Sequence, residues 1–367
     1  MTRKSTIEDI ARLAGVSRTT VSRVLNHRPD VDADTRDRVL RVIEEQGYVP
    51  SITAAGLAGG RSRLLGMLVP FFSWPVMPEL IGGITAVVNR TPYELVLYSY
   101  NDEDLERDRR DIINRLLAGH LTAGLLAIYP GRAAAHLTEL YQEGLPVVVI
   151  DDQQEYHTPW VRADNVTGAY TAVRHLISLG HRRIAHIQGP HEYLASADRY
   201  NGYLRALREA GIAPDPDLAL EGDFLPPSGR ACADRLFALP PEQRPTAIFA
   251  ATDQMAYGVL LSAEAHGLAV PRDLALVGFD DEAPSAHVRP PLTTIRQPYA
   301  EMGQRGIQLL LSMLSETRGA FDREPNTDAA TVPSTVSVPS PIRIELSTTL
   351  IVRASCGADA PISLGVS

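Results

Sequence analysis

Residues 6–25 read TIEDIARLAGVSRTTVSRVL, and their spacing predicts two short helices joined by a tight turn. Thr6 can cap the first helix with Asp9 three residues later, as a short-armed variant of the capping box. Gly15 can adopt the left-handed conformation that turns the chain, and Ser17 can cap the second helix. The apolar faces that would pack together comprise Ile7, Ile10, Ala11 and Ala14 in the first helix and Val21, Val24 and Leu25 in the second. This is the layout of a helix-turn-helix.

The second of these helices has a polar and basic outward face, which comprises Arg18, Thr19, Ser22 and Arg23. Such a face suits the major groove of DNA, where base edges present hydrogen-bond donors and acceptors. The charge distribution agrees, because residues 1–28 hold six basic and two acidic residues, a net +4 that leaves −13 for the rest of a chain of net charge −9. Charge alone also allows a basic tail on an acidic enzyme, and the helix-turn-helix pattern favours a DNA-binding head.

The composition limits the class of protein. The chain has 367 residues, enough for two or three domains, and its 44% hydrophobic content allows a large core. No apolar run approaches the roughly 20 residues of a membrane span, and no apolar leader follows the first five residues. We therefore expect a cytoplasmic, nucleoid-associated protein with no membrane partner. Cys232 and Cys356 lack CxxC spacing, so no disulfide, metal site or cofactor is expected.

Beyond Leu64 the chain alternates strand-like apolar runs with helical ones, which predicts a body of parallel α/β sheets. The expected strands are 64–69, 95–99, 124–128, 147–151, 183–188, 219–221, 247–251, 275–279 and 344–353, and the expected helices are 77–89, 104–118, 165–179, 198–210, 229–237, 254–266 and 299–314. These units are too many for one sheet of ordinary size, so we expect two similar lobes.

The expected division of the chain therefore has four parts. A helical head (1–49), with a third helix over 33–46, is followed by a hinge helix or linker (50–62) and a two-lobed body (63–356). The lobes are expected at about 63–161 with 293–316, and at about 162–290 with 342–355. The Pro-, Ser- and Thr-rich stretch 317–341 predicts a flexible insertion.

Five motifs of the chain resemble those of the lactose-repressor (LacI/GalR-type) family of bacterial transcription regulators. They are the head motif continued to Asn26, then Gly180-His-Arg-Arg-Ile184, Asp253-Gln-Met-Ala-Tyr-Gly258, Leu276-Val-Gly-Phe-Asp-Asp281 and Leu292-Thr-Thr-Ile-Arg-Gln297, in the family's order. The resemblance covers roughly residues 5–315 and the final strand. It implies an all-α helix-turn-helix head on a two-lobed, periplasmic-binding-protein-like body, which binds double-stranded operator DNA as a homodimer under the control of a small-molecule effector.

The resemblance also suggests which head residues contact DNA. Arg18 and Thr19 fall where the family's second helix contacts base edges, and Arg23 matches its third groove-facing position. An arginine can pair with O6 and N7 of guanine, whereas contact with phosphate alone would add affinity without discriminating sequences. The residues expected to cap helices or bind phosphate are Ser5, Thr6, Ser17, Ser22 and Asn26.

In the hinge, Leu57 matches the leucine that family members insert into the minor groove at the operator centre. A leucine buried in a linker helix is the alternative. The sequence departs from the family at Ala55 and Gly56, which replace an Arg-containing pair. Gly56 and Gly59 each weaken a helix by about 1 kcal/mol, so the hinge is expected to fold only on DNA.

For the effector, Asp280 ends an expected strand, where its carboxylate can accept hydrogen bonds from two sugar hydroxyls. Arg199 matches the family arginine that extends across the cleft to a sugar oxygen or carboxylate, with a surface salt bridge as the alternative. Phe224 matches an aromatic residue that stacks on the effector ring. Trp74 occupies a position that lines the same cleft. Either aromatic residue can instead belong to the core.

Two further residues are candidate polar contacts of the effector. Asp151 ends the fourth expected strand, and Thr252 precedes Asp253 at a position where many relatives carry Asn. Asp253 and Asp281 are expected to cap the segments that follow them. Several hydroxyl-binding groups without a dense cationic cluster favour a neutral sugar over a purine or a phosphorylated ligand.

Two other classes of protein compete with a regulator. An enzyme is disfavoured because the chain contains no GxSxG, P-loop, HExxH or GxGxxG motif with a following acid. A two-lobed solute-binding protein would need an export signal and would not carry a basic helix-turn-helix. We therefore expect a sequence-specific DNA-binding regulator, a repressor under allosteric control. The absence of a leucine-zipper pattern in the tail favours a dimer over a tetramer.

Overall fold

The computed structural model describes residues 5–25, 28–48, 62–69, 74–99, 122–129, 134–150, 158–191, 193–321 and 341–358. The chain divides into two compact units, residues 1–63 and 64–367. Three features that the sequence predicts lie outside the described residues. They are the helix at 104–118, the hinge at 50–62 except for its last residue, and most of the insertion at 317–341.

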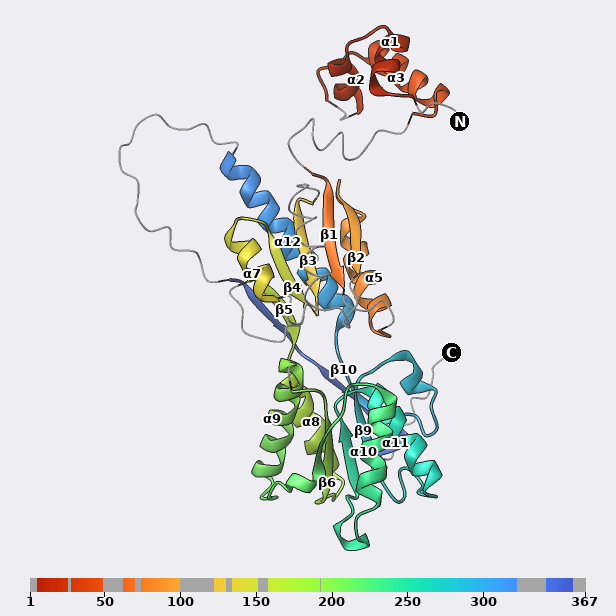
Figure 1. Cartoon of the computed structure of the whole chain (residues 1–367), viewed down its shortest axis with the longest axis vertical. Helices are drawn as coiled ribbons and strands as arrows, with labels where there is room; N and C mark the ends of the chain where they lie inside the picture. The colour runs from red at the N-terminus through yellow and green to blue at the C-terminus, as the bar shows by residue number, and fades with distance from the viewer. Residues whose placement is uncertain are drawn as a thin grey trace, which may run out of the picture. The chain divides into compact units, whose positions relative to one another are not determined.

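The described part of the first unit contains three helices, α1 (Ile7–Ala14), α2 (Arg18–Leu25) and α3 (Ala33–Glu45) (Figure 1). Thr6 caps α1 as predicted: its hydroxyl accepts from the backbone N–H of Asp9, whose carboxylate accepts from the N–H of Thr6. Gly15 then turns the chain with φ of +66°, a conformation that glycine adopts without strain. The core between the helices consists of the buried residues Ile10, Ala11, Ala14, Val21, Val24 and Val39.

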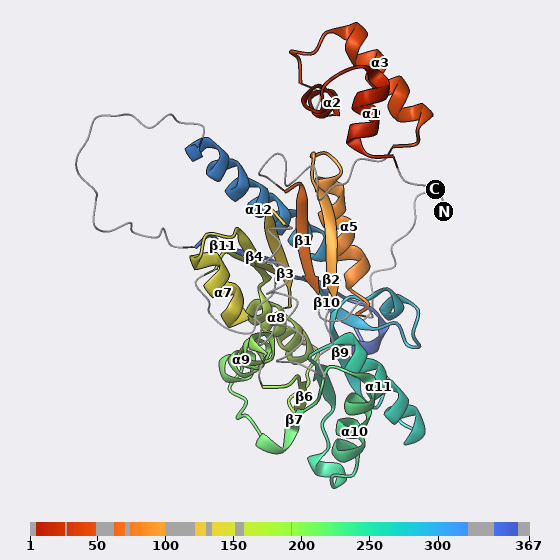
Figure 2. The same cartoon turned by 45° about the horizontal axis from the view of Figure 1, so that its top comes forward.

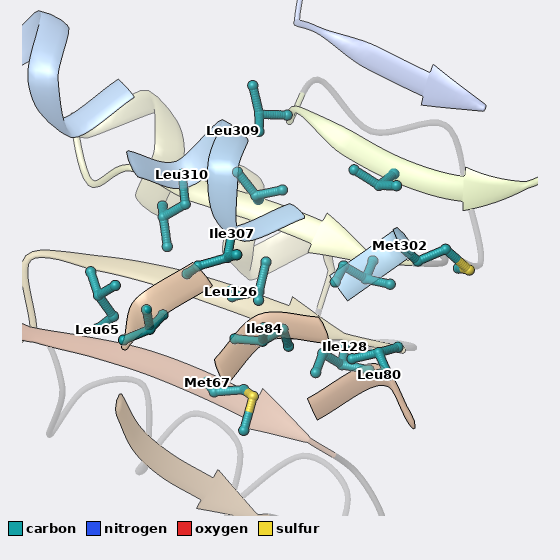
Figure 3. Packing of buried hydrophobic residues seen from close by; sticks show 14 of the residues in the cluster. Leu65, Met67, Leu80, Ile84, Leu126, Ile128, Met302, Ile307, Leu309 and Leu310 are labelled. Atoms are coloured by element: carbon teal, nitrogen blue, oxygen red, sulfur yellow. The ribbon is translucent and has the colours of Figure 1, made fainter. Parts of the chain in front are cut away.

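The first sheet of the second unit is parallel throughout and has the strand order β11-β5-β4-β3-β1-β2. Its strands are β1 (Leu64–Val69), β2 (Glu94–Ser99), β3 (Gly124–Ile128), β4 (Val147–Ile150), β5 (Trp160–Ala163) and β11 (Arg343–Leu346). One face is covered by α5 (Met77–Val88) and α12 (Tyr299–Phe321), which pack against each other, and the other face by α7 (Ala134–Gln142). Figure 3 shows Leu80 and Ile84 of α5 close to Met302 and Ile307 of α12.

The second sheet has the order β12-β10-β9-β8-β6-β7 and is parallel except for β12. Its strands are β6 (Ile184–Gln188), β7 (Ala219–Glu221), β8 (Ala247–Ala250), β9 (Ala275–Asp280), β10 (Thr293–Arg296) and β12 (Thr349–Ile351). One face carries α8 (Asn165–Ser178) and α9 (Leu194–Glu209), and the other α10 (Pro226–Phe237) and α11 (Asp253–Ala265). The members of each helix pair lie side by side in the views of Figure 1 and Figure 2.

Three described connections lead from one sheet to the other: β5 to α8, β10 to α12, and β11 to β12. The structure differs here from the expected lobes, because β10 belongs to the second sheet and β11 to the first. The final strand expected at 344–353 is thus two strands, one in each sheet. The sequence analysis did not predict β5, β10 or α7. Helix α12 continues to Phe321, into the stretch that was expected to be a flexible insertion.

Within the described ranges, no helix combines the length and apolarity that a membrane span requires.

Candidate functional site

The outward face of α2 is polar in the structure, as the sequence predicted. Arg18, Thr19 and Arg23 are exposed, and Ser22 is half-buried. Ser17 caps the helix, since its hydroxyl accepts from the backbone N–H of Thr20 at 3.0 Å. Two other candidate contacts of DNA, Asn26 and Leu57, lie outside the described residues.

Both arginines of α2 form ion pairs with acids from other segments of the head. Nη1 of Arg18 lies 2.8 Å from Oε1 of Glu8 in α1. Nη1 of Arg23 lies 3.1 Å from Oδ2 of Asp30, in the turn before α3. These contacts orient the two guanidinium groups on the exposed face of the head.

In the second unit, Asp280 is the last residue of β9 and is almost completely buried. Its Oδ1 accepts hydrogen bonds from Nε2 of Gln297 at 2.7 Å and from the hydroxyl of Tyr299 at 3.0 Å. Burial raises the pKa of Asp280, and Arg199 and the two hydrogen bonds oppose that shift. Its φ of +119°, followed by +58° at Asp281, is a conformation that residues with side chains rarely adopt, so the surrounding bonds must hold this strained turn.

Arg199 of α9 is 4% exposed, which rules out the surface salt bridge considered as an alternative. Its Nη2 lies 3.9 Å from Oδ1 of Asp280, and its Nε donates to Oδ1 of Asn165 at 2.8 Å. Its Nη1 donates to the carbonyl of Ala251, and its guanidinium lies 3.9 Å from the centroid of the Phe279 ring. The carboxyl ends of β8 and β9 and the N-terminus of α8 together hold this cation beside Asp280.

Asp253 does not cap α11, contrary to the expectation from sequence, because the hydroxyl of Thr252 takes that role by accepting from the N–H of Met255. The Asp253 carboxylate is instead fully buried and accepts from Ser285, Thr294 and the N–H of Glu282. Burial, and then the charge of Asp280, raise the pKa of Asp253 well above its ordinary value. Asp253 therefore ties α11, β10 and the segment after β9 together behind Asp280.

Asp281 was expected to cap the following turn, and it does not do so either. Its carboxylate is 4% exposed and forms ion pairs of 2.6 Å with Nε of Arg296 and with Nη2 of Arg353. These pairs join the end of β9 to β10 and to the segment after β12. The two adjacent aspartates therefore have different partners. Asp280 lies beside Arg199, which is also a candidate effector-binding residue, whereas Asp281 forms ion pairs that join strands and segments of the fold.

The aromatic candidates take separate positions. Phe224, between β7 and α10, has φ of +69° and its ring meets the Tyr193 ring edge-on, with centroids 5.4 Å apart. Its ring lies so near β6 that a Cβ on Gly189 would come within 1.9 Å of it. Trp74 packs against the core of the first sheet, with its ring edge-on to Tyr129 at 4.8 Å. Asp151 lies outside the described residues.

The sequence interpretation missed three residues around Asp280: Asn165, Gln297 and Tyr299. Gln297 ends a motif that the sequence analysis quoted, and its Oε1 is buried without a hydrogen-bond partner among the described residues. Asn165 and Tyr299 follow the ends of β5 and β10, the two strands that the sequence did not predict, so their position beside Asp280 had no visible signal. Among the described side chains, no cluster of His, Cys, Asp or Glu could hold a metal ion.

Comparison with known proteins identifies related sequences over nearly the whole chain. Residues 6–51 match the family model of bacterial regulatory proteins of the lacI family, and residues 173–356 match a periplasmic binding protein-like domain. Catabolite control protein A of Priestia megaterium is 36% identical over 313 residues, which cover 85% of this chain and 93% of that protein.

Two solved structures show the same fold. One is a lac repressor dimer bound to operator and the anti-inducer ONPF, with a TM-score of 0.82, 27% identity and coverage of 97% of this chain and 100% of that one. The other is the transcriptional regulator CelR in complex with cellobiose, with a TM-score of 0.68, 31% identity and coverage of 96% and 99%. These similar proteins are transcriptional regulators and not enzymes.

Proposed function

Because this chain belongs to the lacI family of bacterial regulatory proteins, a family of DNA-binding transcriptional repressors with an effector-binding domain, we propose that a neutral sugar controls its affinity for operator DNA. The observation that carries the proposal is the buried pair of Asp280 and Arg199 at the carboxyl ends of parallel strands, where ligands of such sheets bind. The effector is held there, with Phe224 and Trp74 as aromatic contacts and Thr252 and Asp151 as polar ones.

The hydrogen-bonding groups around Asp280 suit a sugar. The carboxylate of Asp280 and the unpartnered Oε1 of Gln297 are acceptors, so they require a ligand that donates hydrogen bonds, as hydroxyl groups do. The Arg199 guanidinium supplies a donor for a ring or hydroxyl oxygen. One cation, already beside a carboxylate, would not compensate the charge of a phosphorylated ligand. The solved CelR structure, which contains cellobiose, is consistent with this class of ligand.

The proposed control works through the connections between the two sheets. A sugar that contacts Asp280 in the second sheet and residues of the first would favour one arrangement of the lobes over another. In a homodimer, this change would alter the hinge at 50–62 and the insertion of Leu57 into the minor groove. The two heads would then place Arg18, Thr19 and Arg23 on a roughly palindromic site, in the cytoplasm and on the nucleoid.

A two-step experiment tests this function with the full chain. A thermal-shift screen of mono- and oligosaccharides first identifies ligands, since a ligand that binds only the folded protein raises its apparent stability. Operator-like duplexes selected from random DNA are then titrated with and without each ligand. We expect at least one sugar to change the affinity for the selected duplex by tenfold or more. A sugar that stabilises the protein without changing DNA affinity would contradict the coupling, and stabilisation by purines or sugar phosphates alone would contradict the ligand class.

A further inference from the structure

The ion pairs of α2 place an acid beside each cation of the proposed DNA-reading helix. Arg18 and Arg23 are the two arginines of this helix, and their partners Glu8 and Asp30 come from different segments of the head. All four side chains are at least half exposed, so they lie where DNA can reach them. The exposed face of α2 therefore presents neutral pairs and not two free positive charges.

We propose that Glu8 and Asp30 are specificity-determining residues, which hold Arg18 and Arg23 for base contacts and suppress their attraction to phosphate on unrelated DNA. This inference rests on the proposed contact between these arginines and base edges. Glu8 and Asp30 are positioning residues here, since they act through the arginines.

The geometry of the guanidinium group allows the pair to persist on the correct site. Arginine has five N–H donors in a planar fork, and Nη1 of Arg18 contacts Glu8 with one side of that fork. The N–H groups on Nε and Nη2 remain for a bidentate contact with O6 and N7 of guanine. Glu8 would thus fix the plane of the fork before DNA arrives, and less side-chain entropy is lost on binding.

On unrelated DNA the same ion pair lowers the affinity of the head. Nonspecific binding arises almost entirely from cations that neutralise phosphates and release counterions. An arginine already neutralised by Glu8 or Asp30 releases fewer counterions, and the carboxylate itself repels the backbone. Nonspecific affinity therefore falls more than specific affinity, and the ratio of the two rises.

An ordinary exposed ion pair with no role in DNA binding is the competing explanation, because such pairs form often on protein surfaces and contribute little to stability. Removal of one negative charge anywhere on the head would then strengthen binding to all DNA by the same factor. Glu45, the last residue of α3, is an exposed acid of the same unit and provides a matched control.

The test compares the full-length protein with its Glu8→Gln, Asp30→Asn and Glu45→Gln variants. Duplexes selected by the parent chain, and scrambled duplexes of equal length, are titrated at several salt concentrations. We expect Glu8→Gln and Asp30→Asn each to strengthen binding to scrambled DNA about threefold, with a smaller change on selected DNA. The salt dependence on scrambled DNA should steepen by about 0.9 in log Kd against log salt for each variant, as for one more phosphate contact.

Equal changes on both duplexes, of the size seen for Glu45→Gln, would overturn the proposal. An Arg18→Ala variant measured in parallel separates this inference from the function on which it rests. If Arg18→Ala relaxes the selected sequence and Glu8→Gln leaves the ratio of affinities unchanged, the role of Glu8 is refuted and base contact by Arg18 stands. If Arg18→Ala leaves the selected sequence unchanged, base contact by Arg18 and the role of Glu8 are both refuted.

Discussion

The hydroxyl of Tyr299 donates a hydrogen bond of 3.0 Å to the carboxylate of Asp280, although Tyr299 packs against the first sheet and Asp280 belongs to the second. Tyr299 begins α12 and packs in the core of the first sheet, whereas Asp280 ends β9 of the second. The same hydroxyl accepts from Nε2 of Gln297 at 2.7 Å. A protein donor thus already occupies the carboxylate proposed to bind the effector, and a sugar hydroxyl would compete with it.

This contact makes Tyr299→Phe informative. Without the hydroxyl, Asp280 loses a buried donor, and the unliganded protein should lose about 1–2 kcal/mol of stability. A bound sugar can replace the lost donor, so the rise in Tm on adding sugar should be larger in the variant than in the parent chain. Differential scanning fluorimetry at a fixed sugar concentration measures both effects. A rise smaller than that of the parent chain would show that the tyrosine hydroxyl supports the ligand and does not compete with it.

The adjacent aspartates provide a matched pair of variants. Asp280→Asn should abolish the stabilisation by sugar, because the amide keeps only one acceptor oxygen, which Gln297 and Tyr299 occupy, and its NH2 group would face the ligand's donors. Asp281→Asn should lower the stability of the unliganded protein by about 2 kcal/mol, since it leaves Arg353 and Arg296 without their buried partner. The response of Asp281→Asn to sugar should remain. Isothermal titration of both variants checks the contrast, and equal loss of sugar binding in the two would contradict the separate roles.

Much of the fold could be predicted because its signals are local. The cap at Thr6 and the left-handed Gly15 depend on residues within a few positions, and both predictions for the head are confirmed. The buried strands β1, β3 and β8 are continuous apolar runs, which is the pattern of a parallel sheet covered on both faces. These features need no knowledge of distant contacts.

The remaining errors concern features that only tertiary contacts determine. β5 and β10 have four residues each and include polar or charged side chains, so they lack the pattern of a buried strand. The role of Asp253 was misjudged because its position before a helix fits a cap, whereas its partners Ser285 and Thr294 are about 30 and 40 residues away. Membership of one sheet or the other, as for β10 and β11, depends on pairing that a single sequence does not reveal.

The stability of the body should depend on pH through Glu282. Burial raises the pKa of this carboxyl to about 7, so the folded state retains a proton that the unfolded chain loses near its ordinary pKa of 4.5. Since the folded state binds more protons between these values, the free energy of unfolding should fall as pH rises from about 4.5 to 7, by up to about 3 kcal/mol. Urea unfolding at intervals of pH measures this decline.

A Glu282→Gln variant supplies the test of that assignment. The neutral amide cannot titrate, so the decline between pH 4.5 and 7 should become shallower in the variant. The exposed Glu264 of α11 is the matched control, and Glu264→Gln should retain the parent profile. Parallel profiles for the parent chain and Glu282→Gln would assign the pH dependence to other buried carboxyls, such as Asp253.

The proposed base contact of Arg18 predicts a loss of discrimination and not merely of affinity. A bidentate contact with guanine contributes about 1–3 kcal/mol of discrimination against other bases, whereas a phosphate contact contributes equally on every sequence. Selection from random duplexes with Arg18→Ala should therefore yield sites in which one base position per half-site has become variable. Arg41, exposed on α3, offers a control that removes the same charge, and Arg41→Ala should weaken binding without changing the selected sequence. If Arg18→Ala weakens selected and scrambled duplexes by the same factor, Arg18 contacts phosphate alone, and sequence discrimination must come from other residues of the head.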